Sequence, residues 1–317
     1  MTKQLKIERL QNAALQLMSK INSALETDAP EGLFRLSADK HLMDAKMSEI
    51  EKGKFNFDTL SQIERAALLK AVLRELRSEQ GPLFTQEQFK QLTDVEMPVA
   101  VNGLLEQKKV ADQKITFYLF ELLKSLKKYE ATTKMPTANL AIIFAPNLFP
   151  ELPAPNVSKL SSEEALKKTR ELQADNDAKV TFIADLVDKA TVDPLVIPKP
   201  KLSTHYDYQV KAPSENRFHA FSATGKGLDE KFKNLTGDLL KSKILEDFKE
   251  QLEHATADNI DQVVVDIEES SEYKALATGQ GVMTRLFHLE TSSVKAFKDM
   301  VAERRADLEL ENSFKPK

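Results

Sequence analysis

Apolar residues recur at helical spacing along most of this chain, and that spacing limits what the chain can fold into. Near the amino terminus they are three, four or seven residues apart, at Leu10, Ala14, Leu17, Met18, Ile21 and Leu25. A half-buried strand would instead alternate apolar and polar side chains. Glycine, which weakens helices, is scarce, with 9 among 317 residues. The pattern therefore predicts an all-α protein.

Prolines and glycines divide the helical pattern into segments. Residues 115–126 are apolar on nearly every side, which is typical of a helix buried at the centre of a bundle. The next helix has Pro136 at its start, and we expect Pro146 to end it. In the first 190 residues we expect helices from about residue 10 to 28 and over 39–52, 59–77, 85–92, 115–126 and 135–146, with one or two more over 161–190.

Length and composition favour two domains. A single core stops growing at roughly 250 to 300 residues, and this chain has 317. Residues 192–218 hold four prolines and show no helical period, which is typical of an extended linker. We expect a first domain over residues 1–192, a linker over 193–218, and a second, smaller helical domain over 219–317, which includes one short helix over 259–277.

Charge and cysteine content exclude several classes of protein. The net charge of −4 gives no basic surplus, so we expect no nucleic-acid partner. The absence of cysteine excludes disulfides and thiolate nucleophiles. The most apolar segment, 138–149, is shorter than the ~20 residues that span a bilayer, and it contains two asparagines and a proline. We see no Sec-type signal and expect a cytoplasmic protein without a transmembrane segment.

Motifs of enzymes and metal sites are missing. The histidines are scattered and form no HExxH pair, so we expect no metal site. Gly225 and Lys226 invite comparison with a phosphate-binding loop, but that loop needs glycine at 220 and Ser or Thr at 227, where this chain has alanine and glycine. We interpret the segment as a turn before a helix. No GxSxG sequence is present.

Three segments carry the most specific pattern. They read EGLFRLSA at 31–38, AALLKAVLREL at 66–76 and KMPTANLAIIFAPNLF at 134–149. Together they resemble the Rho GTPase-activating (RhoGAP) domain family in identity, order and spacing. The family's segments have the forms EGIFRxSG, LLKxFLRELP and KMTxxNLAIVFGPNL. The resemblance covers about residues 10–192 and implies a RhoGAP-like helical bundle.

The resemblance also implies a function. A domain of this family binds the GTP form of a Rho-family small GTPase and accelerates its hydrolysis of GTP. The chain would be an activator and not itself an enzyme, with no cofactor of its own, because the partner binds Mg-GTP. By position, Arg35 matches the arginine finger that the family inserts into the partner's active site. Leu33 and Phe34 would anchor the loop in the core while Arg35 points outward.

Four further residues match positions at the family's interface. Lys70 and Arg74 match residues that contact the GTPase and brace the finger loop, and they share a helix face because they are four apart. Asn139 and Asn147 match the asparagines of the third segment, which contributes one asparagine to the interface. Which of the two it is stays open. Helix capping or a buried hydrogen bond is the competing role for both.

The chain departs from the family pattern at three places. Ala38 and Ala145 replace glycines, and Arg77 with Ser78 stands where the second segment has a proline. Alanine at 38 would restrict the finger loop if that position needs a positive φ. These departures keep a second interpretation open. In it the chain is a non-catalytic adaptor that binds a GTPase while its second domain contacts a membrane or another partner.

The carboxyl-terminal part carries a weaker resemblance. Residues 272–297 resemble a small helical module found near the carboxyl termini of effector proteins secreted by intracellular bacteria. The resemblance implies action on the GTPases of a host cell, in the host cytosol. Residues 283–287 mix a cationic and several apolar side chains, which suits contact with lipid head groups at a membrane surface. A packing or dimerisation domain is the alternative.

Overall fold

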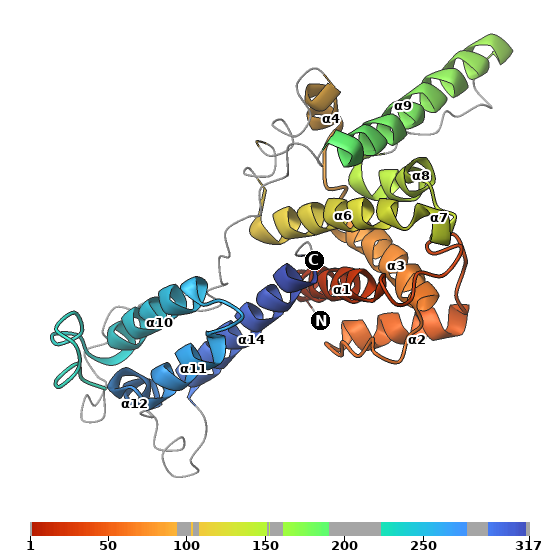
Figure 1. Cartoon of the computed structure of the whole chain (residues 1–317). Coiled ribbons are helices and arrows are strands. Elements are labelled where there is room, and N and C mark those ends of the chain that lie inside the picture. Colours follow the sequence, from red (N-terminus) through yellow and green to blue (C-terminus); the bar gives the residue numbers. More distant parts are fainter. Residues whose placement is uncertain are drawn as a thin grey trace. The chain divides into compact units, whose positions relative to one another are not determined.

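The computed structural model describes residues 2–93, 103, 108–150, 152, 161–189, 223–277 and 291–314. Within these ranges the regular structure is helical, apart from one isolated bridge between Thr224 and Thr236. The chain divides into two compact units, residues 1–198 with 313–317 and residues 199–312 (Figure 1). The predicted all-α class, with a second helical part, is confirmed. The predicted linker lies outside the described residues.

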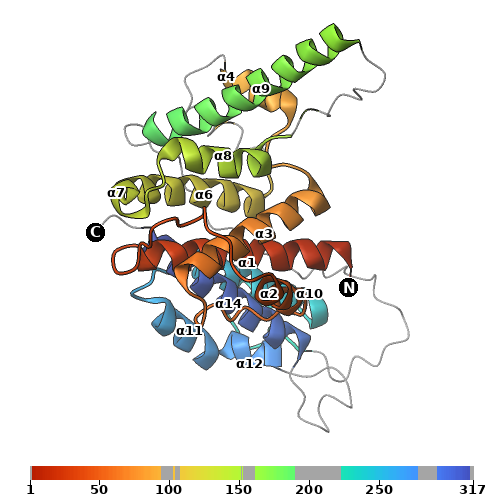
Figure 2. The same ribbon diagram turned by 90° about the vertical axis from the view of Figure 1, so that its right-hand side faces the viewer.

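The first unit is a bundle in which α1 lies against α2, α3 and α6, and α8 lies against α3, α6 and α9 (Figures 1 and 2). The sequence left one or two helices open over 161–190, and the structure has one, α9. The helices of this unit are α1 Lys3–Ala24, α2 Lys40–Glu51, α3 Gln62–Gln80, α4 Gln86–Thr93, α6 Val110–Lys128, α7 Glu130–Thr133, α8 Thr137–Leu148 and α9 Ser162–Lys189.

Burial and capping explain where these helices form. All residues of α6 from Lys114 to Phe120 are buried, which confirms the prediction of a central helix. The more exposed helices begin with side-chain caps. Asp39 accepts a hydrogen bond from the first turn of α2, and Ser61 and Glu64 form a reciprocal capping box at the start of α3.

The prediction that Pro146 ends its helix is wrong, because α8 continues through Pro146 to Leu148. A proline inside a helix removes the hydrogen bond to the carbonyl four residues earlier. That carbonyl belongs to Ile142, which lies on the exposed side of α8. The buried side chains of Leu148 and Phe149 hold the last turn in the core.

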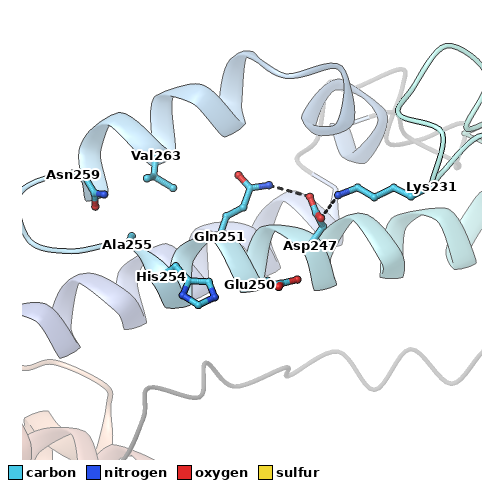
Figure 3. Close-up of a pocket in the computed structure, with 8 residues that line it drawn as sticks. All are labelled: Lys231, Asp247, Glu250, Gln251, His254, Ala255, Asn259 and Val263. Carbon is cyan, nitrogen blue, oxygen red and sulfur yellow. Dashed lines mark hydrogen bonds and ion pairs between the residues drawn. The ribbon is translucent and has the colours of Figure 1, made fainter.

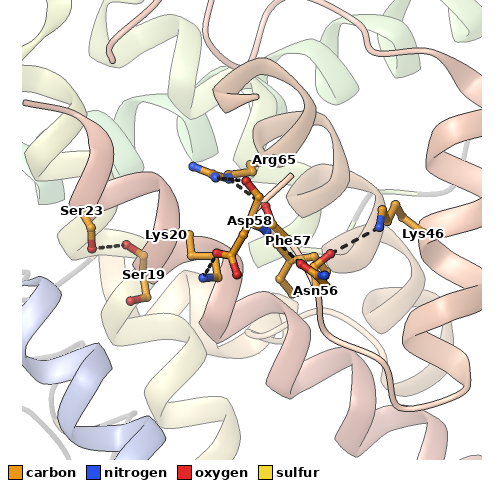
Figure 4. Close-up of polar contacts among 8 residues, drawn as sticks. All are labelled: Ser19, Lys20, Ser23, Lys46, Asn56, Phe57, Asp58 and Arg65. Carbon is orange, nitrogen blue, oxygen red and sulfur yellow. Dashed lines mark hydrogen bonds and ion pairs between the residues drawn. The ribbon is translucent and has the colours of Figure 1, made fainter. Parts of the chain in front are cut away.

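The loop between α2 and α3 is held by cations from three helices (Figure 4). Lys20 of α1 lies 2.5 Å from the Asp58 carboxylate, and Lys46 of α2 donates to the Asn56 carbonyl at 3.3 Å. Arg65 of α3 donates to the Asp58 carbonyl at 3.2 Å. These contacts join the loop to α1, α2 and α3.

Lys6 joins α1 to α3. Its Nζ lies 2.5 Å from Glu75 Oε1 and 2.7 Å from Glu79 Oε1. The hydrogen bonds to these carboxylates raise the pKa of Lys6, and the bond from Lys6 lowers the pKa of Glu79 below its usual 4.5. A carboxylate with a lowered folded-state pKa stabilises the fold above its unfolded pKa, and this contribution is lost as the pH falls through the folded pKa.

Lys6→Met is therefore expected to lower the thermal unfolding midpoint at neutral pH and to matter less in acid. Between about pH 7 and about pH 3 the gap between wild type and variant should narrow, because only the wild type has the Glu79 contribution to lose. Calorimetry over this pH series measures the gap. A gap that stays constant with pH would contradict this explanation of the lowered pKa.

The second unit has four described helices, α10 Gly237–His254, α11 Ile260–Glu269, α12 Ser271–Ala277 and α14 Ser292–Ser313. The single helix expected over 259–277 is interrupted at Ser270, whose extended backbone ends α11 and whose Oγ accepts from the Tyr273 amide at 3.0 Å. The segment around Gly225 is a turn before α10, as predicted, and its amide donates to the Leu235 carbonyl at 2.9 Å.

Phe248 and Phe297 meet edge to face in the core of this unit, with ring centroids 5.6 Å apart. Across the ranges that the structure describes, none of the helices is both long enough and apolar enough to cross a membrane. Residues 283–287, considered above for lipid contact, lie outside those ranges.

Candidate functional site

In the segment that follows α1, an exposed arginine comes directly after two buried apolar residues. Leu33 and Phe34 are buried, whereas the Arg35 side chain is 57% exposed. The backbone folds into a tight turn, in which the amides of Arg35 and Leu36 both donate to the Gly32 carbonyl, at 2.8 and 2.9 Å. We call residues 30–38 the Arg35 loop. Its geometry is the one the sequence predicted, with two apolar anchors and an outward arginine.

The Arg35 loop holds backbone strain next to the arginine. Gly32 has φ +77°, which favours glycine, and a Cβ placed there would lie 2.8 Å from Leu36 Cγ, so a larger residue would displace the Leu36 side chain. Phe34 has φ +69°, which costs of order 1–3 kcal/mol for a residue with a bulky side chain. The Phe34 ring is fixed in the core, edge to face with Phe144 at 5.2 Å. The strained turn directs Arg35 to solvent.

Two hydrogen bonds fix this loop to the bundle. Lys70 Nζ on α3 donates to the Phe34 carbonyl at 2.6 Å. The Gly32 amide donates to the carbonyl of Thr133, at the end of α7, at 2.7 Å. The loop is therefore held by α3 at Phe34, directly before Arg35, and by α7 at Gly32, three residues before Arg35.

The charges around the loop are mainly positive. Burial lowers the pKa of Lys70, and the charge of Arg74 lowers it further. Arg74 is exposed, one helical turn beyond Lys70 on α3. Arg35 Nη2 lies 3.9 Å from Glu31 Oε1, and both side chains are exposed. An exposed pair at that distance contributes little, so Arg35 can leave Glu31 for a stronger anion.

The two asparagines of the third segment lie differently on α8. Asn139 is exposed in the first turn of the helix. Asn147 is partly buried, and its Nδ2 is 3.5 Å from the Ile143 carbonyl of the same helix. The Asn139 side chain is thus open to solvent, whereas the Asn147 amide bonds to its own helix. Their role at an interface stays a prediction.

The departures from the sequence pattern do not strain the fold. Ala38 is not among the positive-φ residues of the described chain, so the loop has no need of glycine there. Ala145 is buried within α8, where alanine favours the helix. At Arg77 and Ser78 the helix continues instead of meeting a proline, and α3 ends only at Gly81, which has φ +89°.

Sequence reasoning missed two elements of this site. The left-handed backbone of Phe34 had no signal in the sequence, because aromatic residues rarely adopt that conformation. The Thr133 carbonyl had none either, since a backbone acceptor does not depend on residue type. The adjoining Lys134, also left-handed with φ +55°, marks a sharp turn that a glycine or asparagine would have signalled.

A hollow lies in the second unit, between α10 and α11 (Figure 3). Three of its polar side chains pair with one another, because Asp247 accepts from both Lys231 and Gln251. His254 lies on the same helix, but across the described residues no group of three His, Asp or Glu side chains suits a metal ion. Nothing in this hollow indicates a catalytic site.

Two family models match separate parts of the chain. The RhoGAP domain matches residues 16–152, and the DrrA phosphatidylinositol 4-phosphate binding domain matches residues 214–312. The first match contains the Arg35 loop, α3 and α8, and the second covers the described helices of the second unit up to residue 312.

Curated relatives match about two fifths of the chain. GTPase activating protein homolog 2 of Dictyostelium discoideum is 28% identical over 135 residues, which are 42% of this chain and 15% of the relative. Rho GTPase-activating protein 18 of Mus musculus is 32% identical over 146 residues, 42% of this chain and 21% of the relative. Rho GTPase-activating protein 24 of Mus musculus is 32% identical over 126 residues, 37% of this chain and 17% of the relative. The chain spans about a fifth or less of these relatives' length.

Two solved structures are similar over about half of the chain. Human Rho GTPase activating protein 15 covers 55% of this chain and 81% of its own, at 19% identity and a TM-score of 0.43. The BH domain from GRAF, the GTPase regulator associated with focal adhesion kinase, covers 56% of this chain and 92% of its own, at 18% identity and a TM-score of 0.42.

Proposed function

The chain carries a RhoGAP domain over residues 16–152, and from this premise we propose that the protein is a GTPase-activating protein for Rho-family small GTPases. Its partner is the GTP-bound GTPase, which binds Mg-GTP, and this chain brings no cofactor of its own. The protein is an activator and not a hydrolase. The observation that carries the proposal is the Arg35 loop, which presents an exposed arginine from a base fixed by Lys70 and Thr133.

The chemistry of the partner's reaction gives Arg35 its role. Transfer of a phosphoryl group to water spreads negative charge over the γ-phosphoryl and leaving oxygens. A guanidinium brought to these oxygens stabilises that charge, and its planar fork reaches two oxygens at once, which lysine cannot do. An arginine supplied in trans accelerates such reactions by about 10³ to 10⁵, or roughly 4 to 7 kcal/mol of barrier. Arg35 is the finger of this chain.

The other site residues support the finger or contact the partner. Lys70 braces the Arg35 loop through the Phe34 carbonyl. Arg74, exposed one turn away on α3, contacts the GTPase. Asn139 and Asn147 of α8 complete the interface, with Asn139 the more available of the two.

A non-catalytic adaptor is the competing function, and binding to different nucleotide states separates the two. A catalyst binds the transition state more tightly than the ground state. The wild-type chain should therefore hold a Rho GTPase most tightly when it carries GDP with fluoroaluminate, a planar anion in place of the transferred phosphoryl group. An adaptor would hold the form loaded with a non-hydrolysable GTP analogue at least as tightly. That result would overturn the catalytic proposal.

A membrane-binding role for the second unit rests on a separate observation. Residues 214–312 match a domain described as binding phosphatidylinositol 4-phosphate. We propose that this part of the chain binds that lipid and so brings the RhoGAP domain to the membrane. Residues 283–287 combine Arg285 with Leu286 and Phe287, a composition suited to an interfacial contact.

The full chain should sediment with phosphatidylcholine vesicles that contain phosphatidylinositol 4-phosphate, at least about ten-fold more tightly than with phosphatidylinositol, because the added phosphate meets cationic donors. The double variant Leu286→Ser/Phe287→Ser should bind less tightly. The matched control is Leu239→Ser/Val265→Ser, two exposed apolar residues of the same unit, which should bind as wild type does. Equal sedimentation with both lipids would refute lipid recognition.

The resemblance of the carboxyl-terminal part to secreted bacterial effectors suggests where the protein acts. We propose that it is delivered into a host cell and inactivates the host's Rho GTPases in the cytosol. Expression of the full chain in the cytosol of a eukaryotic cell should lower the GTP-bound fraction of a Rho GTPase, and the Arg35→Ala chain should not. An unchanged fraction with the wild-type chain counts against the proposal.

A further inference from the structure

A basic hollow lies near the Arg35 loop, where α6 ends and α7 and α8 begin. Its volume is about 610 Å³, and it is lined by Lys127, Lys128, Glu130, Ala131, Lys134 and Pro136. Three lysines and one glutamate line it, and one of the lysines, Lys127, is paired with Asp188 outside the lining, so the hollow carries a small positive surplus. We call it the lysine hollow. None of the roles proposed above uses it.

Two of its lysines are available to a ligand. Lys127 is paired, with its Nζ 2.5 Å from Asp188 Oδ1. The side chains of Lys128 and Lys134 are exposed and have no ion pair or hydrogen bond within the ranges that the structure describes. Lysines in the last turn of a helix interact favourably with its dipole, which accounts for Lys127 and Lys128. It does not account for Lys134, which lies beyond α7.

Charge indicates the ligand. The lysine hollow is an open surface depression lined mainly by charged residues, so it suits a small charged group. A phosphate monoester carries about −1.5 to −2 charges at neutral pH, and Lys128 and Lys134, which have no ion pair within the described ranges, would attract it. Lysine binds phosphate as a point charge through up to three donors. We propose that the lysine hollow binds a phosphate-bearing anion between Lys128 and Lys134.

Such a ligand would act on the Arg35 loop through α7. This helix is a single turn between Lys128 and Lys134, and it contains Thr133, whose carbonyl accepts from the Gly32 amide. Thr133 is fully buried, and its Oγ1 donates to the Tyr129 carbonyl at 2.9 Å. An anion held by both lysines joins the two ends of α7 and restrains Thr133. Occupancy of the lysine hollow therefore stiffens the Arg35 loop. This regulatory consequence rests on the proposed function, whereas the binding itself does not.

The binding test uses the full isotope-labelled chain and inorganic phosphate as the probe, followed by amide NMR shifts without any GTPase. Saturable shifts at Lys128 and Lys134 are expected. In Lys128→Glu/Lys134→Glu the dissociation constant should rise at least about ten-fold, because two attractive contacts become repulsive. Lys167→Glu/Lys168→Glu makes the same charge change at exposed positions on α9 and should bind as wild type does. Absence of saturation, or equal affinity in both double variants, would overturn the proposal.

A vesicle arm identifies the source of the phosphate. Phosphatidic acid in phosphatidylcholine vesicles offers a phosphate monoester without inositol, so it does not engage recognition of an inositol lipid. If the Lys128→Glu/Lys134→Glu chain sediments less than the α9 control, the hollow takes a lipid headgroup. If the two chains sediment equally while inorganic phosphate discriminates between them, the hollow takes a soluble phosphate.

The Gly32 amide reports the coupling to the Arg35 loop. It should shift with the same dissociation constant as the lysines, because its acceptor is Thr133. A Gly32 signal that stays fixed at saturating phosphate would overturn the coupling. None of these measurements depends on GTP hydrolysis. The phosphate-binding proposal can therefore be rejected while the proposed GTPase activation is confirmed, and the reverse result is also possible.

Discussion

Arg35→Ala is expected to lower the stimulated rate of GTP hydrolysis by about 10³-fold or more at saturating protein, the range lost when an arginine finger is removed. The side chain is exposed and has one weak pairing with Glu31, so its removal leaves no buried group without a partner. The variant should therefore keep the fold and still bind the GTP-loaded GTPase. Single-turnover hydrolysis measures the rate, and a binding titration measures the affinity.

Arg35→Lys is the matched control for charge. It keeps the positive charge but loses the planar fork that reaches two oxygens, so it should recover only a small part of the rate. If Arg35→Ala retained full acceleration, the finger would lie elsewhere in the chain. If it lost binding as completely as rate, Arg35 would be a docking residue and not a finger.

Lys70→Met should lower the rate at saturation by about ten- to a hundred-fold, because it leaves the Phe34 carbonyl without its donor. An unsatisfied buried carbonyl costs about 1 to 3 kcal/mol. Phe34 already carries backbone strain at φ +69°, so the loop should relax away from the conformation that presents Arg35. The effect should appear in the rate within the complex, because the loop and not the interface has changed. Single-turnover hydrolysis at saturating variant measures it.

Two variants test whether Lys70 acts as a brace. Lys70→Arg keeps a donor near the Phe34 carbonyl and should recover much of the rate. Arg74→Ala removes the exposed neighbour on α3, so it should weaken binding with little effect on the rate at saturation. A Lys70→Met protein that only binds less tightly, with an unchanged rate at saturation, would place Lys70 in the interface and reject the brace.

The sequence predicted the helices well because their signal is periodic and local. Burial around α6 followed from apolar spacing, and the helix expected over 39–52 is observed as α2, Lys40–Glu51. The prediction that Pro146 ends α8 was wrong because a proline near the end of a helix removes only one hydrogen bond there. The buried Leu148 and Phe149 keep the last turn in place. Ser270 was missed because a serine within a helical pattern is an ambiguous signal until its hydroxyl is seen to cap the next turn.

The sequence predicted which residues form the candidate site, but not the hydrogen bonds that hold the Arg35 loop in place. The pattern around Arg35 identified the residues, and the apolar Leu33 and Phe34 predicted that the loop is anchored in the core. The left-handed Phe34 and the Thr133 acceptor depend on backbone geometry, which residue types do not encode. The concern about Ala38 applied only if that position needed a positive φ, and the structure places the positive φ values at Gly32 and Phe34 instead.

The most direct test of the central claim is single-turnover GTP hydrolysis by a panel of Rho-family GTPases, with and without saturating wild-type protein. We predict acceleration of at least about 10³-fold for one or more members of the panel, and its loss with Arg35→Ala. Hydrolysis that stays at the intrinsic rate across the whole panel, despite binding of the GTP-loaded form, would contradict the claim.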